Sequence, residues 1–469
     1  MQELVGEVLE RGEQLVPLIA ANEPQLGGEI LQELRSSLLD LVRLDPQDVG
    51  DLLVGHAAPH GEVEQLAALV VDPRESLAEL LHADGDHGWS LTGDTGRYRD
   101  AVAELKNISL ARGAPSLDIV AVDELRAAAD RAFERDPAGA FSYGTSAGYP
   151  RLLAWIAAKH GVAPEQVVAT NGSMQADAFL FQQLVGPGDV VAVEAPTYDR
   201  TLLALRKLGA EILAIPLEPD GIDVEALSRA LAGGARPKLA HIIPNFQNPA
   251  GCTLSLEKRR RLLELAEEYG FLIFEDDPYV ELRFAGEQLP TMLSLDDGGR
   301  RVVYASSFSK TVCPGIRVGY LVGGEGLIGE IRKLATQTYI SPSMVSQAIV
   351  AEFCESGAIE RSIETVKKAL RGRRDATCAA LQEELPEASF VVPEGGYFLW
   401  VDLPEGTDVE PVEAASRQRG VTFVKGADFL LEGGENSLRI AYSGVAPDLI
   451  REAVARVASA WRELAGAAA

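Results

Sequence analysis

Short apolar runs alternate with amphipathic stretches between about residues 170 and 323, and this alternation constrains the fold more than any other feature. Six runs have the length and composition of strands: DVVAVEA, AEILAIPL, LAHIIPN, FLIFEDD, RVVYASS and RVGYLVG. Helical stretches such as SLEKRRRLLELAEEYG separate them. Strands joined through helices favour a mostly parallel sheet that is covered on both faces. The predicted fold class is therefore α/β, with ligands bound beyond the carboxyl ends of the strands.

The chain has 469 residues, which predicts two or three domains rather than one core. We expect an acidic helical extension over residues 1–100, a large domain over residues 101–345 and a smaller α+β domain over residues 346–469. In the last of these, a long helical stretch precedes the strand-like runs GGYFLWVDLP and SLRIAYS. The extension is interpreted either as a helical cap that stabilises the fold or as a lid over a substrate pocket.

The balance of charges argues against several classes of partner. The formal net charge of −27 disfavours binding to nucleic acid and to anionic membranes. The first residues lack the basic start and apolar core of a signal peptide, and no apolar run is long enough to span a bilayer. Four scattered cysteines form no CxxC pair and no HExxH motif occurs, so neither a disulfide framework nor a metal site is predicted. A reducing cytoplasm is the expected location.

The stretch TNGSMQADAF follows a strand-like EQVVA and opens an amphipathic helix. Its Gly172 and Ser173 allow backbone N–H groups to face outward at the helix N-terminus, which is a favourable site for a phosphate group. The same residues also fit an ordinary turn and helix cap.

Three further motifs follow predicted strands. They are NFQNPAG, which contains Asn248, FLIFEDDPY, which contains Asp276, and ASSFSKTVCPGIRVGY, which contains Lys310. Each alone fits a turn, a capped helix or an exposed lysine. However, a partly desolvated lysine beside a fixed positive charge such as Arg317 has a lowered pKa and can act as a nucleophile toward an aldehyde.

Together these motifs resemble the fold-type I pyridoxal-phosphate enzymes, the class I/II aminotransferases. The motifs YGTSAGYPRLL, NGSMQADAF, NFQNPAG, EDDPY, SSFSKTVCPGIRVGY and SLRIAYS occur in the order of that family over roughly residues 105–465. The sequence patterns SSFSK-x-x-x-PG-x-RVG and PEGGYFLW are most similar to those of one branch of the family. That branch contains 2-aminoadipate and kynurenine aminotransferases and the effector domains of MocR regulators. The resemblance implies an aspartate-aminotransferase-like fold with a mostly parallel seven-stranded sheet, bound pyridoxal 5'-phosphate, and a homodimer with shared active sites.

The resemblance also implies roles for individual residues. Lys310 would form the internal aldimine, Asp276 would pair with the pyridine nitrogen, and Tyr198 would stack on the ring. Asn248 and Tyr279 would hydrogen-bond the oxygen on the ring. The implied phosphate ligands are Gly172, Ser173, Met174, Ser307, Ser309 and Arg317, with Tyr143 from a second subunit. Arg439, in SLRIAYS, would bind the substrate α-carboxylate with Asn248 nearby.

The substrate and the reaction type are less tightly constrained by these motifs than the cofactor is. Arg112, in ISLARGAP, either serves a distal carboxylate of the substrate or closes a surface salt bridge. The predicted reaction transfers an amino group from an amino acid to a 2-oxo acid. The same residues would support a biosynthetic lyase or synthase that performs γ-elimination or replacement on an S-adenosylmethionine-type substrate, or amino-acid oxidation or cyclisation. A MocR-like regulator is disfavoured because residues 1–85 contain four basic and seventeen acidic residues.

Overall fold

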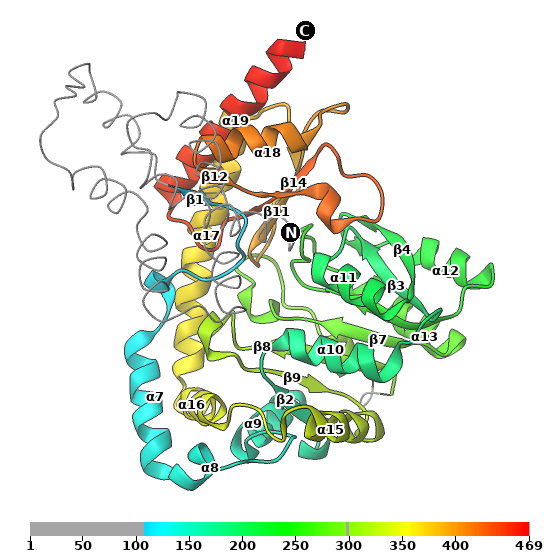
Figure 1. The fold of residues 1–469 in the computed structure, drawn as a ribbon, viewed down its shortest axis with the longest axis vertical. Helices are drawn as coiled ribbons and strands as arrows, with labels where there is room; N and C mark the ends of the chain where they lie inside the picture. Colours follow the sequence, from blue (N-terminus) through cyan, green and yellow to red (C-terminus); the bar gives the residue numbers. More distant parts are fainter. Residues whose placement is uncertain (1–106, 297–299, 469) are drawn as a thin grey trace, which may run out of the picture. The chain divides into compact units, whose positions relative to one another are not determined.

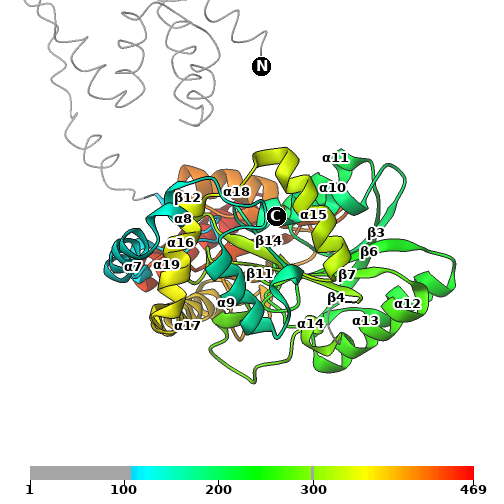
Figure 2. The same cartoon turned by 90° about the horizontal axis from the view of Figure 1, so that it is seen from below.

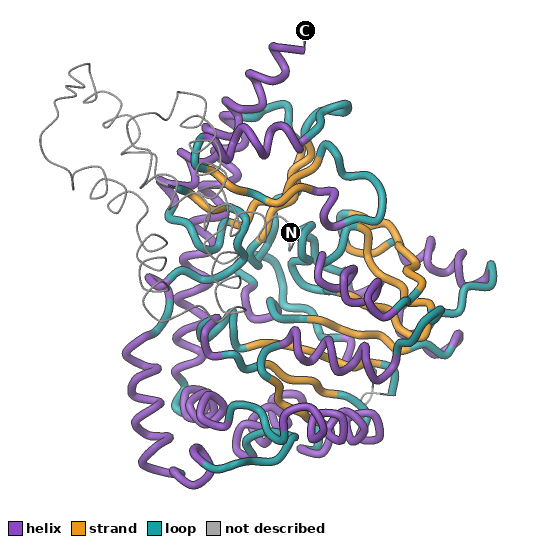
Figure 3. Tube along the Cα trace, viewed as in Figure 1, coloured by secondary structure: helices purple, strands orange, loops and turns teal. Residues whose placement is uncertain are grey.

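The computed structural model describes residues 107–296 and 300–468. The predicted helical extension over residues 1–100 lies outside these described residues. The described chain contains an eight-stranded sheet, a four-stranded sheet and a two-stranded pair, which Figure 3 distinguishes from the helices by colour. None of the helices within the described ranges is long and apolar enough to cross a membrane.

The eight-stranded sheet has the order β2-β9-β8-β7-β6-β3-β4-β5. Its strands are β2 (Val167–Thr170), β3 (Val190–Ala195), β4 (Glu211–Glu218), β5 (Gly221–Ile222), β6 (Pro237–Ile242), β7 (Leu272–Asp276), β8 (Val302–Ser307) and β9 (Gly319–Val322). The five central strands β8, β7, β6, β3 and β4 are parallel, whereas β9 runs antiparallel to both its neighbours. Seven longer strands match the predicted number, and β5 adds a two-residue eighth strand at one edge through a tight turn after β4.

Helices cover both faces of this sheet, as the view in Figure 2 shows. One face packs against α10 (Ser173–Leu184), α11 (Asp199–Leu208) and α15 (Glu325–Tyr339). The other face packs against α9 (Pro150–His160), α12 (Val224–Ala232), α13 (Leu256–Tyr269), α14 (Met292–Leu295) and α16 (Met344–Glu355). The buried strand residues are mostly Val, Ile, Leu and Ala, which is the composition expected of strands buried on both faces.

A second core lies in the C-terminal part of the chain. Its four-stranded antiparallel sheet contains β10 (Ser389–Phe390), β11 (Phe398–Asp402), β14 (Ser437–Ala441) and β13 (Val424–Lys425). The helices around it are α17 (Ala358–Glu384), α18 (Val409–Gln418) and α19 (Pro447–Ala468), and α7 (Val122–Arg135) and α8 (Pro137–Phe141) complete the described helices of the chain.

The start of the described chain packs with this C-terminal core. Strand β1 (Ile108–Ser109) pairs in parallel with β12 (Val421–Thr422), and Figure 1 shows the two side by side. Ile108 and Leu110 are buried among side chains of the C-terminal core. The segment that follows β1 is thereby held close to the C-terminal sheet. The domain boundaries at residues 100 and 345 remain predictions.

One predicted strand begins later than its sequence pattern suggests. RVGYLVG was expected to be extended from its first residue, but β9 begins at Gly319. Arg317 has a φ of 50° and occupies the left-handed region at the end of the short 3-10 turn Pro314–Ile316. This sharp bend directs the Arg317 side chain back toward the start of α10, where its Nη2 donates to the carbonyl of Asn171.

Candidate active site

The residues predicted from the strand ends gather at the carboxyl edge of the large sheet. Asp276 is the last residue of β7, and Lys310 lies three residues after the end of β8. Tyr198 follows the end of β3, and Gly172 follows the end of β2, which runs in the same direction as β8. Parallel strands bring their carboxyl ends to a single edge, and the sequence pattern predicted this location.

Lys310 is partly buried and surrounded by aromatic rings. Its Nζ lies 5.7 Å from the ring centre of Tyr279 and 5.1 Å from that of Tyr397, and it donates a 2.8 Å hydrogen bond to the carbonyl of Gly113. Burial, and then the positive charges of Arg439 and Arg317, lower the pKa of the Lys310 amine to about 8. The lowered pKa gives this amine a larger neutral fraction near neutral pH than an ordinary lysine has, which favours a role as nucleophile and proton carrier.

Asp276 has a buried carboxylate group, and one of its two oxygens makes no hydrogen bond. The residue is 6% exposed, and Oδ1 has no hydrogen-bond partner. The other oxygen, Oδ2, lies 3.5 Å from Nε2 of His241. A buried carboxylate oxygen without a partner is costly, so this position favours a ligand that brings a positively charged N–H group.

The N-terminus of α10 forms a cradle with Arg317. The N-cap residue is Gly172, with a φ of 87°, and no side chain caps the helix. A Cβ atom on Gly172 would lie 2.1 Å from Nη2 of Arg317, so only glycine allows the guanidinium to approach the helix start this closely. The half-buried Ser173 and the exposed Met174 occupy the first turn. Helix N–H groups beside an arginine suit a phosphate dianion.

Two serine hydroxyls extend this cradle from the β8 side. Ser307 Oγ accepts from the backbone N–H of Ser309 at 3.1 Å, and Ser309 Oγ accepts from Nη1 of Arg317 at 3.3 Å. Both serines are 7% exposed. The Ser307 hydroxyl also donates to the carbonyl of Val318 at 3.4 Å, whereas the Ser309 hydroxyl keeps its donor free for a phosphate oxygen within the described residues.

Two tyrosines share the electrostatic environment of Asp276. Burial is the largest cause that raises the pKa of Tyr198 to about 12 and the pKa of Tyr279 well above its ordinary value, and the charge of Asp276 adds to both shifts. Both phenols are therefore neutral hydrogen-bond donors at physiological pH. Tyr198 is the N-cap of α11, whereas Tyr279 precedes a 3-10 turn and packs against Tyr397 with ring centres 5.6 Å apart.

Arg439 enters the site from the C-terminal sheet. It lies on β14, and its guanidinium carbon sits 4.4 Å from the ring centre of Phe398 and 4.8 Å from that of Phe429. Nη1 donates to Oδ1 of Asn248 at 2.9 Å, and Nη2 donates to the carbonyl of Ala111 at 2.6 Å. The buried Nε has no partner. This stacked, planar fork is well shaped for a carboxylate.

Two predicted residues stand apart from this cluster. Tyr143 lies in the loop after α8 and is 86% exposed. Arg112 is exposed, and its side chain makes no hydrogen bond or ion pair within the described part of the chain. The surface salt bridge that the sequence allowed for Arg112 is therefore not formed with any residue of the described ranges.

Sequence reasoning missed several groups that surround Lys310 and Arg439. The hydroxyl of Tyr397 donates to the carbonyl of Lys310 at 3.2 Å. The carbonyl groups of Gly113 and Ala111 hold the two cationic side chains, and a Cβ on Gly113 would lie 2.3 Å from the Phe398 ring. Tyr397 occurs in PEGGYFLW, a motif that signalled its importance, whereas a backbone carbonyl leaves no mark in a sequence pattern.

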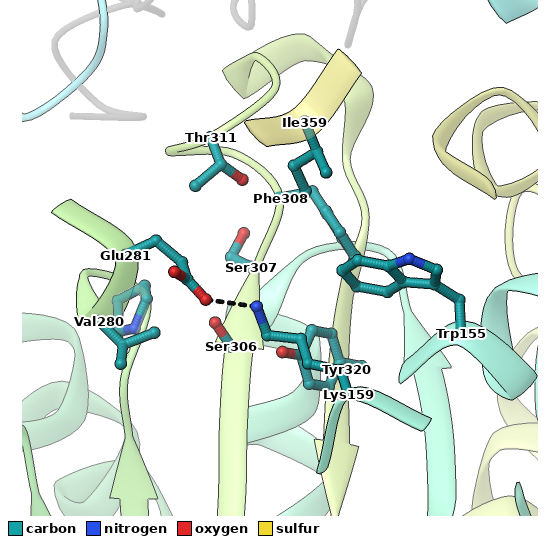
Figure 4. A pocket seen from close by; sticks show the side chains of 11 residues that line it. Trp155, Lys159, Val280, Glu281, Ser306, Ser307, Phe308, Thr311, Tyr320 and Ile359 are labelled. Carbon is teal, nitrogen blue, oxygen red and sulfur yellow. Dashed lines mark hydrogen bonds and ion pairs between the residues drawn. The ribbon is translucent and has the colours of Figure 1, made fainter. Parts of the chain in front are cut away.

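A small cavity of about 20 Å³ lies on the α9 side of β8 (Figure 4). Trp155, Phe308 and Tyr320 line it, and Lys159 forms an ion pair with Glu281 across it. Its volume suits about one water molecule. The cavity is therefore too small to hold a cofactor.

The residues present fit pyridoxal 5'-phosphate. The unpartnered Oδ1 of Asp276 suits a protonated ring nitrogen, the uncapped start of α10 suits the phosphate, and the amine of Lys310 suits the aldehyde.

Comparisons with known proteins agree with this geometry. The family model "Aminotransferase class I and II" matches residues 106–457. Aromatic-amino-acid aminotransferase 1 of Thermococcus litoralis is 34% identical over 368 residues, which covers 76% of this chain and 88% of the relative. The 2-aminoadipate transaminase of Thermus thermophilus is also 34% identical, over 76% of this chain and 90% of the relative.

A solved structure extends the likeness to the fold. The α-aminoadipate aminotransferase LysN of Thermus thermophilus, complexed with N-(5'-phosphopyridoxyl)-L-leucine, superposes with a TM-score of 0.74 at 32% identity and covers 81% of this chain and 100% of its own. The aspartate-aminotransferase-like fold and the use of pyridoxal 5'-phosphate are thereby confirmed. This chain belongs to the class I and II aminotransferases, which are enzymes that depend on pyridoxal 5'-phosphate.

Proposed function

We propose that Lys310 and Asp276 carry the chemistry of amino-group transfer in this enzyme. The observation that supports this most is their position at one sheet edge, where Lys310 has a lowered pKa and Asp276 keeps one buried oxygen unpartnered. Bound pyridoxal 5'-phosphate supplies a ring that delocalises the electrons left when a bond at the substrate Cα breaks. Asp276 binds the ring nitrogen and keeps it protonated. Lys310 would hold the cofactor covalently, and its amine would carry the proton to and from Cα.

The neighbouring residues bind and orient the cofactor in this proposal. Tyr198 stacks on the ring, and Asn248 and Tyr279 donate hydrogen bonds to its oxygen; the neutral phenol of Tyr279 supports this role. The phosphate group is held by Gly172, Ser173, Met174, Ser307, Ser309 and Arg317. Their proximity around the uncapped N-terminus of α10 supports this assignment.

We further propose that the enzyme is a homodimer with shared active sites. Tyr143 is directed into solvent in a single chain, which suits a residue that completes the phosphate site of a partner. Light scattering on the purified protein tests the assembly. A dimer in which Tyr143→Phe weakens cofactor binding supports the proposal, whereas a monomer that retains full activity would contradict it.

For the substrate, we propose an amino acid with an aromatic or long acidic side chain and a 2-oxo acid as acceptor. Relatives named for aromatic amino acids and for 2-aminoadipate support this choice. Arg439 binds the α-carboxylate, as supported by its stacked guanidinium and its bond to Asn248. Arg112, unpaired within the described chain, is the candidate for a distal carboxylate. A cytoplasmic location is also proposed, on the basis of four free cysteines.

The test is a set of single half-reactions with the purified enzyme. Glutamate, 2-aminoadipate, phenylalanine and kynurenine are added separately, and the cofactor spectrum and the oxo-acid product are measured. Conversion to the amine form of the cofactor with release of the matching oxo acid supports transamination. Release of methylthioadenosine from S-adenosylmethionine without this conversion would instead support γ-elimination.

A regulatory role would depend on residues 1–85, which lie outside the described residues; a DNA shift at physiological salt would support it.

A further inference from the structure

His241 lies on β6 beneath the helix that forms the phosphate cradle. In the register of the sheet, His241 is paired with Phe274 on β7, and Asp276 lies two residues farther along the same strand. Residues two apart on a strand point to the same face, so His241, Phe274 and Asp276 share the face covered by α10. In the sequence, His241 lies within the apolar run LAHIIPN, which gives no sign of a functional role.

The imidazole of His241 is fully buried without a hydrogen bond. Its exposure is 0%, and neither Nδ1 nor Nε2 has a hydrogen-bond partner. The ring packs against Phe181 of α10 and against Phe274, with ring centres 6.1 Å and 5.1 Å away. Oδ2 of Asp276 lies 3.5 Å from Nε2. A buried imidazole without a hydrogen bond destabilises the folded protein. We therefore expect Nε2 of His241 and Oδ2 of Asp276 to move within hydrogen-bonding distance when the cofactor binds.

Asp177, on the helix that covers this face of the sheet, interacts electrostatically with Asp276. It lies on α10, one helical turn before Phe181, is 9% exposed and has an Oδ1 atom without a partner. Burial first, and then the charge of Asp276, raise the pKa of the Asp177 carboxyl well above its ordinary value. Burial therefore favours the uncharged form of the Asp177 carboxyl more than it would at an exposed site. The other titratable groups that face Asp276 are Glu194 from β3, Tyr198 from α11, Lys310 after β8, and Asp277 and Tyr279 after β7.

We propose that His241 is a positioning residue for Asp276. Its Nε2–H donates a hydrogen bond to Oδ2 in the cofactor-loaded enzyme and thereby presents Oδ1 to the ring nitrogen. A donor to a carboxylate in a water-excluded site both fixes the carboxylate plane and stabilises its charge. The inference rests on the proposed role of Asp276 and adds the residue that orients it.

Two substitutions separate this role from simple packing. His241→Phe keeps an aromatic ring between Phe181 and Phe274 but removes the donor, whereas His241→Gln places an amide N–H near the position of Nε2. The affinity for pyridoxal 5'-phosphate is measured by titrating the cofactor-free full-length chain, together with the pH midpoint of the bound cofactor's absorbance and the Tm of the cofactor-free protein.

We expect His241→Phe to weaken cofactor binding by about ten- to a hundredfold and to shift the pH midpoint, because a hydrogen bond to a charged group is lost. His241→Gln should restore the affinity to within about threefold of the wild type. Both variants should keep the Tm of the cofactor-free protein within a few degrees. Unchanged affinity in His241→Phe, or an equal loss in both variants, would overturn the proposal.

A measurement on the unaltered protein keeps the proposal testable if His241→Phe does not fold. The chain has six histidines, so ¹⁵N-histidine NMR spectra can be assigned with His241→Gln as the reference. The expected result is a protonated Nε2 and an unprotonated Nδ1 at His241 in the loaded enzyme; an unprotonated Nε2 would overturn it. If the wild-type enzyme does not convert amino acids, that result counts against the proposed function. The cofactor affinities and the NMR spectra test the role of His241 separately, because neither requires turnover.

Discussion

The cofactor side and the substrate side of the candidate site are built in different ways. On the cofactor side, Asp276 and Lys310 come from consecutive strands of the large sheet, where the order of the parallel strands determines their positions. On the substrate side, Arg439 comes from the C-terminal sheet, and the segment after β1 lies against it. Residues on rigid parallel strands are positioned by the fold itself, whereas the substrate side depends on contacts between distant segments.

The two sides nevertheless share one segment, which contacts the cationic side chain of each. Lys310 and Arg439 both donate to backbone carbonyls of one short segment, those of Gly113 and Ala111. Cofactor and substrate must replace these bonds with their own. Changes on the cofactor side should therefore weaken cofactor binding or catalysis, whereas changes on the substrate side should alter substrate choice and leave the cofactor in place.

The largest effect is expected for Lys310→Ala. Removal of the amine eliminates both the covalent attachment point and the proton carrier, so kcat should fall by at least about 10³-fold. The absorbance of the lysine-bound cofactor should disappear, as measured by spectrophotometry. A purified variant that keeps this absorbance band would contradict the assignment of Lys310 as the attachment point of the cofactor. Lys159→Ala, which changes a lysine paired with Glu281 outside the cluster, is the control and should keep the band.

Arg439→Lys tests the substrate side. The lysine keeps the charge but loses the planar fork that stacks between Phe398 and Phe429, so KM for the amino acid should rise by about 10- to 100-fold. The cofactor spectrum should not change. Steady-state kinetics with the best amino donor give the measurement, and Arg417→Lys, at an exposed side chain of α18, serves as the control. If the variant lost the cofactor but kept its KM, Arg439 would belong to the cofactor side and not to the substrate side.

Gly172→Ala tests how closely the phosphate cradle is packed. The new Cβ would displace the Arg317 guanidinium, so the dissociation constant of the cofactor should rise by about tenfold. Gly161→Ala is a matched control, because Gly161 also has a positive φ, of 66°, but a Cβ there meets no atom within 4 Å. Gly161→Ala, in the left-handed helical region, should lose about 1–2 kcal/mol of stability from backbone strain. Gly172→Ala should lose about 1–3 kcal/mol, because a ψ of 163° with a positive φ places Gly172 in a region that is essentially restricted to glycine. Equal cofactor affinity in the two variants would exclude a special role for the cradle.

The smallest effect is expected for Arg112→Ala. Its side chain is unpaired within the described ranges, so the Tm should stay within about one degree. KM for 2-aminoadipate should rise by about threefold or more, with little change for phenylalanine, because only the former carries a distal carboxylate. An equal response to both donors would remove Arg112 from the substrate side.

The sequence predicted where the proposed cofactor-side residues lie more fully than where the proposed substrate-side residues lie. Strands buried on both faces leave apolar runs whose ends can be read directly, which located Asp276 and Lys310. The late start of β9 was not predictable, because Arg317 adopts a left-handed conformation that its residue type does not announce. The contacts of Gly113 and Ala111 were not predictable either, since backbone carbonyls have no side-chain signature and the pairing of β1 with β12 joins segments about 300 residues apart.

The central claim is that pyridoxal 5'-phosphate is bound covalently at Lys310 on the carboxyl edge of the large sheet. Reduction of the purified wild-type enzyme with borohydride, followed by digestion and peptide mass spectrometry, tests this claim most directly. The expected result is a pyridoxyl group on the peptide that contains Lys310 and on no other lysine. Attachment at a different lysine, or a cofactor-loaded enzyme without any modified peptide, would contradict it.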